Sequence, residues 1–177
     1  METITFLKRN VTPGAAAEGG PVDEYQLKVA LVFQDPRTRA EAQAVRDRLA
    51  AVVDEASIHC TEWRINELLK PAVFRDGAAA LADADAIVIA LPGTGHLPAV
   101  FYLWVNLWLQ QRQSAPGALI ALVGVTSGQN LAFIETRSYL HAVASQGRLE
   151  LLFKRFDPAA EPLPDLGNRL RQWSQAA

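Results

Sequence analysis

The sequence has little cysteine, little net charge and no long apolar run. Cys60 is the only cysteine among 177 residues, so no intramolecular disulfide can form and a cysteine-based metal site is excluded. The formal net charge is −2, which offers no basic excess to a nucleic acid or an anionic membrane. No segment has the roughly 20 apolar residues that span a bilayer, and residues 1–10 lack the apolar core of a secretory signal. We therefore expect a soluble, cytoplasmic protein with no nucleic-acid or membrane partner.

Histidine is also scarce. His59, His96 and His141 are far apart, and no two of them have the spacing of metal ligands. His59 adjoins Cys60, but neighbouring residues of a strand point to opposite faces. The sequence therefore predicts no metal site.

Two regions differ in composition. Residues 11–23 are rich in glycine, proline and alanine and predict a linker, which follows a short strand at residues 3–7. That strand could pair with a sheet edge or a neighbouring subunit, or it could fray. We predict an N-terminal arm and flexible linker over residues 1–23 and one domain over residues 24–177, since half of the residues are hydrophobic and the length suits a single core.

Apolar runs of strand length alternate with segments of helical periodicity from residue 27 onward. The predicted strands are 27–33, 58–63, 86–91, 118–125 and 149–153. The predicted helices follow Asp35-Pro36 and cover 74–81, 98–109, 131–146 and 166–173. Strands separated by helices of this length imply right-handed crossovers. We therefore predict a three-layer α/β fold, with a five-stranded parallel sheet in order 2-1-3-4-5 and helices on both faces.

A ligand of such a sheet binds beyond the carboxyl ends of the strands, where the winding direction reverses. Three loops meet there: 34–39, 92–97 and 126–130. The strand and loop at 84–92 (ADAIVIALP) and 93–99 (GTGHLPA), with 121–128 (ALVGVTSG), resemble the corresponding segments of the flavodoxin-like NAD(P)H-dependent FMN reductases. The resemblance implies a flavodoxin-like fold and FMN as cofactor. Its implied contacts with the flavin ring are Gly93, Thr94, Gly95 and His96, with Thr126, Ser127 and Gly128 beside them.

The first loop departs from that family, which has a run of small residues around the FMN phosphate. Here Pro36 lacks an amide donor and Asp35 places a negative charge where a phosphate would lie. Thr38 and Glu41 have the spacing of a capping box, which would satisfy the helix terminus internally. Two alternatives stay open: Arg37, Thr38 and Arg39 bind the cofactor's anion, or the loop is a capped helix start with two solvated arginines.

The helix predicted at 98–109 has more apolar surface than one sheet-facing stripe requires. Its apolar residues are Val100, Phe101, Leu103, Trp104, Val105, Leu107, Trp108 and Leu109. One interpretation covers the excess with the N-terminal arm or the last helix. The other is a homodimer in which Trp104 and Trp108 anchor the interface.

Two functions follow from the sequence. The first is an FMN-binding, NAD(P)H-dependent reductase, in which the flavin carries the chemistry and the chain supplies no essential acid or base. The second is a cofactor-free flavodoxin-like protein that acts by self-association or partner binding. Enzymatic activity is undecided between them.

Overall fold

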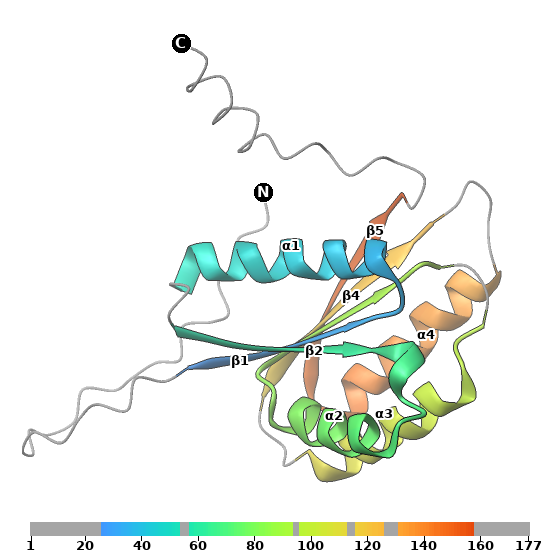
Figure 1. The fold of residues 1–177 in the computed structure, drawn as a ribbon. Coiled ribbons are helices and arrows are strands. Elements are labelled where there is room, and N and C mark those ends of the chain that lie inside the picture. Colours follow the sequence, from blue (N-terminus) through green and yellow to red (C-terminus); the bar gives the residue numbers. More distant parts are fainter. Residues whose placement is uncertain (1–25, 54–56, 94–95, 113–115, 126–130, 158–177) are drawn as a thin grey trace, which may run out of the picture.

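The computed structural model describes residues 26–53, 57–93, 96–112, 116–125 and 131–157. Strands and helices alternate along these residues, as the periodicity predicts (Figure 1). The strands are β1 (Leu27–Phe33), β2 (Ile58–Arg64), β3 (Ala86–Leu91), β4 (Gly117–Gly124) and β5 (Leu149–Phe156). The helices are α1 (Pro36–Val53), α2 (Pro71–Asp83), α3 (Ala99–Gln111) and α4 (Leu131–Gln146), with a short 3-10 helix, η2 (Ile65–Glu67), after β2.

The five strands form one parallel sheet in the order β2-β1-β3-β4-β5. All six residues of β3 are buried, and β1 is buried except at Lys28. Central parallel strands are covered on both faces, which is why these two strands are almost wholly apolar. The predicted fold class and strand order are therefore confirmed. The edge strand β5 runs three residues further than predicted, to Phe156.

Helices lie on both faces of the sheet. Figure 1 shows α1 on one side and α2, α3 and α4 on the other. The two faces have separate apolar cores: the larger contains residues of α2, α3 and α4, and the smaller contains Ala42 and Leu49 of α1. The predicted arm at 1–23 and the predicted helix at 166–173 lie outside the described residues.

Helix α3 is the middle helix of its layer, between α2 and α4. Trp104 and Trp108 are completely buried, and the indole nitrogen of Trp104 donates a hydrogen bond of 3.0 Å to the carbonyl of Phe74 in α2. On the opposite flank, the rings of Tyr102 in α3 and Tyr139 in α4 are 4.8 Å apart. The excess apolar surface is therefore covered largely by the flanking helices. Neither tryptophan reaches the surface, so neither side chain is available to a partner in this structure, and the homodimer itself stays a prediction.

Arg112 joins the carboxyl ends of the three helices in this layer. Its guanidinium donates to the carbonyls of Leu81 (3.3 Å), Ala82 (3.4 Å) and Ala84 (2.9 Å) at the end of α2. Its Nε donates to the carbonyl of Gly147, just beyond α4, at 3.2 Å. Burial lowers the pKa of Arg112, an effect that Asp85 and Asp83 partly oppose. One buried cation therefore donates to carbonyls at the ends of both neighbouring helices, of which that of Leu81 also accepts from the amide of Ala84.

Candidate functional site

The backbone amides at the start of α1 donate hydrogen bonds to the side chains of Asp35 and Thr38. The carboxylate Oδ1 of Asp35 accepts a hydrogen bond from the amide of Thr38 at 2.8 Å. In return, Oγ1 of Thr38 accepts from the amides of Asp35 (2.9 Å) and Gln34 (3.1 Å). The capping box is thus formed by Asp35 and Thr38. The predicted pair of Thr38 and Glu41 is wrong by one turn, because Pro36 is the first residue of the helix and makes Asp35 the N-cap.

The two arginines of this loop point to different partners. Arg37 donates through Nη2 to the carbonyl of Asp157, just after β5, at 3.0 Å. Arg39 forms an ion pair with Glu62 of β2, with Nη2 to Oε2 at 2.7 Å, and its guanidinium lies 5.7 Å from the centre of the Phe33 ring. Arg37 and Arg39 therefore do not converge on one anion site, and Thr38 is buried within the cap.

Glu62 accepts hydrogen bonds from both Arg39 (2.8 Å) and Gln43 (2.9 Å). Partial burial raises the pKa of Glu62, but these hydrogen bonds and the positive charges of Arg39 and Arg46 together outweigh burial and lower it overall. The carboxylate is therefore held in its charged form, which keeps Arg39 beside β2.

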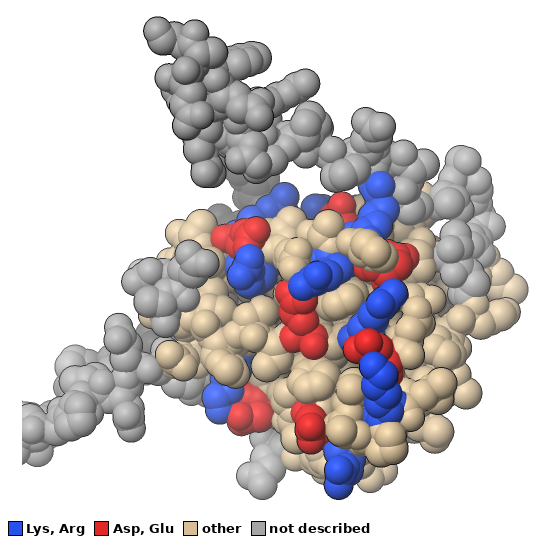
Figure 2. Space-filling view, viewed as in Figure 1, with Lys and Arg blue, Asp and Glu red and all other residues tan. Residues whose placement is uncertain are grey.

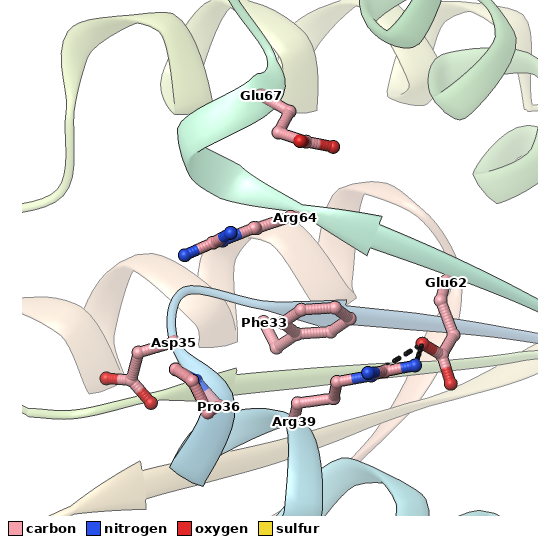
Figure 3. A pocket seen from close by; sticks show the side chains of 7 residues that line it. All are labelled: Phe33, Asp35, Pro36, Arg39, Glu62, Arg64 and Glu67. Carbon is pink, nitrogen blue, oxygen red and sulfur yellow. Dashed lines mark hydrogen bonds and ion pairs between the residues drawn. The ribbon is translucent and has the colours of Figure 1, made fainter.

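A pocket of about 280 Å³ lies at the carboxyl ends of β1 and β2 (Figure 3). Phe33 forms its floor between Arg39 and Arg64, and the carboxylate of Asp35 points away from the Arg39–Glu62 pair. The lining residues are Phe33, Asp35, Pro36, Arg39, Glu62, Arg64 and Glu67. These include three carboxylates and two guanidiniums, so the pocket has no positive excess for a phosphate. Within the described part of the chain, Arg64 has no hydrogen-bond or ion-pair partner.

The loops after β3 and β4 touch through their backbones. Gly93 has a φ of 74°, a left-handed conformation that favours glycine. A Cβ added at Gly93 would lie 1.6 Å from the carbonyl oxygen of Gly124, and one added at Gly124 would lie 2.4 Å from that of Pro92. Both positions therefore require glycine. His96, the next described residue of the β3 loop, is exposed.

Half of the predicted site can be placed. Thr94, Gly95, Thr126, Ser127 and Gly128 lie outside the described residues, so their predicted contacts stay predictions. Among the residues that the structure does describe, no group of three His, Cys, Asp or Glu side chains could hold a metal ion. None of the described helices is long and apolar enough to cross a membrane.

The pocket contains residues that sequence reasoning missed. Arg64 is the last residue of β2 and Glu67 lies in η2, just after the predicted strand 58–63, which reads from the sequence as a polar edge with no chemical motif. They join Phe33 only because β2 pairs with β1 in parallel, with Arg64 opposite Phe33. Figure 2 shows basic and acidic side chains intermixed on the visible face. That face therefore has no large patch of one charge.

No protein-family model matches this sequence, and the search of curated proteins finds no match. Solved structures do match. An oxidoreductase from Corynebacterium diphtheriae has a TM-score of 0.57 at 13% identity, covering 86% of this chain and 93% of its own. A flavodoxin from Streptococcus pneumoniae TIGR4 has a TM-score of 0.51 at 14% identity, covering 83% and 94%. The Trp repressor binding protein of Bacillus subtilis has a TM-score of 0.50 at 9% identity, covering 84% and 97%.

These likenesses and the strand order define a flavodoxin-like fold. At such low identity they describe the fold alone, so the function has to be argued from the site.

Proposed function

We propose that this chain is a flavodoxin-like protein that acts by self-association or partner binding and holds no FMN phosphate in its β1–α1 loop. The observation that carries the proposal is the reciprocal cap between Asp35 and Thr38.

That cap uses the donors that a phosphate would need. The amides of Gln34 and Asp35 donate to Oγ1 of Thr38, and the amide of Thr38 donates to the Asp35 carboxylate. The amide of Arg39 donates to the carbonyl of Asp35 at 2.9 Å, as in an ordinary helix. Pro36 has no amide hydrogen. Four backbone amides of the loop therefore already donate hydrogen bonds to acceptors within the loop.

The cap also places a carboxylate at the helix N-terminus, where an anion would bind. A phosphate monoester carries a charge of about −1.5 to −2 at pH 7, so it would have to displace Asp35 or lie against it. Arg39 cannot readily compensate, because its guanidinium is paired with Glu62. The residues of this loop do not fit FMN in the manner of the family, and we assign no reaction step to the flavin.

The surface that we assign to association is the outward side of α3. Leu103 has 63% of its surface exposed and Tyr102 has 37%, on a helix whose tryptophans are internal. Leu103 is therefore the apolar side chain of α3 that a second subunit or another protein would bury. We propose a homodimer through this helix, with Leu103 in the role first predicted for Trp104 and Trp108.

The FMN reductase remains the second candidate. It is favoured by the left-handed Gly93, which lies in the segment that resembles the FMN reductases, and by the likeness to the C. diphtheriae oxidoreductase. FMN would then have to be held without the amides of the β1–α1 loop.

The visible spectrum of the purified protein and an FMN titration followed by fluorescence quenching separate the two candidates. We expect a colourless protein and no quenching at micromolar FMN. Asp35→Ser keeps a capping side chain but removes the charge, so comparing it with the parent tests whether the carboxylate excludes the phosphate. Stoichiometric FMN in the unmodified protein would refute the proposal and establish the second candidate's cofactor.

Sedimentation velocity tests the association. Leu103→Glu should shift the chain from dimer to monomer, whereas Val52→Glu, at a residue 68% exposed on α1 in the other layer, should not. A monomeric parent protein, or a dimer insensitive to Leu103→Glu, would exclude this surface.

A further inference from the structure

The pocket at the carboxyl ends of β1 and β2 has no part in the association that we assign to α3. Five charged residues are among those that line it. Arg39 and Glu62 form an ion pair with each other at 2.7 Å. Glu67 accepts a hydrogen bond from the ammonium of Lys70, outside the pocket, at 3.1 Å. These three lining residues each have a partner of opposite charge, which leaves one guanidinium and one carboxylate.

The remaining two charged residues are Arg64 and Asp35. Within the described part of the chain, the exposed guanidinium of Arg64 has no hydrogen-bond or ion-pair partner. The amide and the hydroxyl of Thr38 both donate to Oδ1 of Asp35, at 2.8 and 3.0 Å, and among the described residues no donor contacts Oδ2. Arg64 and Asp35 do not pair with each other in the described structure. The pocket therefore contains one cation and one carboxylate oxygen that can bind a ligand.

The fold fixes the positions of these two residues. Arg64 ends β2 and lies opposite Phe33, the last residue of β1, in the parallel register. Asp35 follows Phe33 by two residues and is held as the N-cap of α1. In Figure 3 the guanidinium of Arg64 and the carboxylate of Asp35 both extend to the side of Phe33 that is away from the ion pair. A molecule bound on that side can contact both charges.

The two charges together select a zwitterion. A phosphate or another plain anion would be attracted by Arg64 but repelled by Asp35, and a plain cation would meet the reverse. A molecule that carries both a carboxylate and an ammonium can form a charge-assisted hydrogen bond with each of the two side chains.

The rest of the lining that faces this side is apolar. The ring of Phe33 forms the floor, and Pro36 lies beside it at the start of α1. The volume of about 280 Å³ is below the roughly 300–1,000 Å³ of pockets that hold drug-sized ligands, so the ligand must be smaller. A free α-amino acid with an apolar side chain meets this limit. It carries both charged groups on one carbon atom, and its side chain can pack on Phe33.

We propose that this pocket binds a free α-amino acid with an apolar side chain. The carboxylate of the ligand contacts Arg64, its ammonium contacts Asp35 and its side chain packs against Phe33. Asp35 thus disfavours a phosphate at the β1–α1 loop and at the same time supplies a binding group for a different ligand. The site does not include Leu103 or the outward side of α3, so it is independent of the proposed association.

Titrations of the isotope-labelled full chain, followed by amide NMR shifts, measure the affinity. The probes are L-phenylalanine and L-leucine, and 3-phenylpropanoate and 2-phenylethylamine are analogues of phenylalanine that each lack one charge. We expect the amino acids to bind with dissociation constants of about 1 mM, as suits ligands of this size. The shift changes should centre on Phe33 and Arg64. Each analogue should bind about tenfold more weakly than L-phenylalanine.

Two substitutions separate the contributions of the two charges. Arg64→Gln should weaken the binding of L-phenylalanine and of 3-phenylpropanoate about tenfold. Asp35→Asn keeps an acceptor for the cap. It should weaken the binding of L-phenylalanine about tenfold but strengthen that of 3-phenylpropanoate, because a like charge is removed. The matched control Arg48→Gln, at an exposed residue further along α1, should change neither affinity.

Three results would each overturn the proposal. The first is an absence of shift changes with both amino acids at about 10 mM, roughly ten times the expected dissociation constant. The second is an analogue that binds as tightly as L-phenylalanine. The third is an Arg64→Gln or Asp35→Asn variant that binds L-phenylalanine like the parent protein, with a spectrum that shows it to be folded. None of these results would affect the association through Leu103, which sedimentation tests separately.

Discussion

The two faces of the sheet are built in different ways. One face carries three helices, and its central helix α3 has four fully or almost fully buried side chains: Phe101, Trp104, Val105 and Trp108. The other carries α1 in the described structure and leaves Leu152 on β5 43% exposed. The buried side of α3 contributes mainly to stability, whereas Leu103 on its outward side is 63% exposed. The face with fewer described helices instead leaves a side chain of the sheet itself, Leu152, exposed.

The largest expected effect is on the three-helix face. Trp104→Ala removes a fully buried indole and its hydrogen bond to Phe74, and should lower the free energy of unfolding by about 3–5 kcal/mol. Urea unfolding followed by circular dichroism measures the loss. Leu152→Ala on the other face is the comparison and should cost less than half as much. Equal losses of unfolding free energy in the two variants would contradict the view that the two faces are packed differently.

The second-largest loss of stability is expected for substitutions of Arg112. Arg112→Met keeps much of the apolar stem but leaves the carbonyls of Leu81, Ala84 and Gly147 without this donor. Because buried acceptors lose their partner, we expect a loss of about 2–4 kcal/mol, with Arg112→Lys in between. Denaturant midpoints rank the stability of the parent protein and the two variants. An Arg112→Met variant as stable as the parent would show that water hydrogen-bonds to these helix ends instead.

The cap of α1 is expected to matter less. Asp35→Ala should cost about 1 kcal/mol, as for other N-caps, because the amide of Thr38 loses its acceptor. Asp35→Asn keeps an acceptor and should cost a few tenths. Thermal unfolding separates the two variants. A neutral Asp35→Ala would mean that the cap contributes no stability on the α1 face.

The smallest effect concerns Tyr139, on the three-helix face. Burial first, and then the neighbouring Tyr102, raise the pKa of Tyr139 to about 12, and its hydroxyl has no hydrogen-bond partner in the described structure. The unfolded chain, with the ordinary pKa of about 10, loses this proton first, so the free energy of unfolding should fall between pH 10 and pH 12. Tyr139→Phe should reduce that fall and change stability little at pH 7. Parallel alkaline curves for the two proteins would contradict the assignment.

The predictions for the α1 cap and for Trp104 differ from the structure for two separate reasons. Thr38 and Glu41 have the residue types of a capping box, but Pro36 suits the first position of a helix and makes Asp35 the cap. That signal was available in the sequence. The burial of Trp104 was not, because a helical period shows which residues share a side and says nothing about the neighbours on that side.

Over the described residues, the sequence by itself determined the strands, the helices and their order, because hydrophobic periodicity and helix-terminal residues act over a few neighbouring positions. Parallel order followed from the helix-length connections. Only the tertiary structure decided that α2 and α4 enclose Trp104, that Arg112 joins three helix ends, and that Arg37 and Arg39 diverge to Asp157 and Glu62. These contacts join residues that are 23 to 120 positions apart, and such pairs are set by how the elements pack in space.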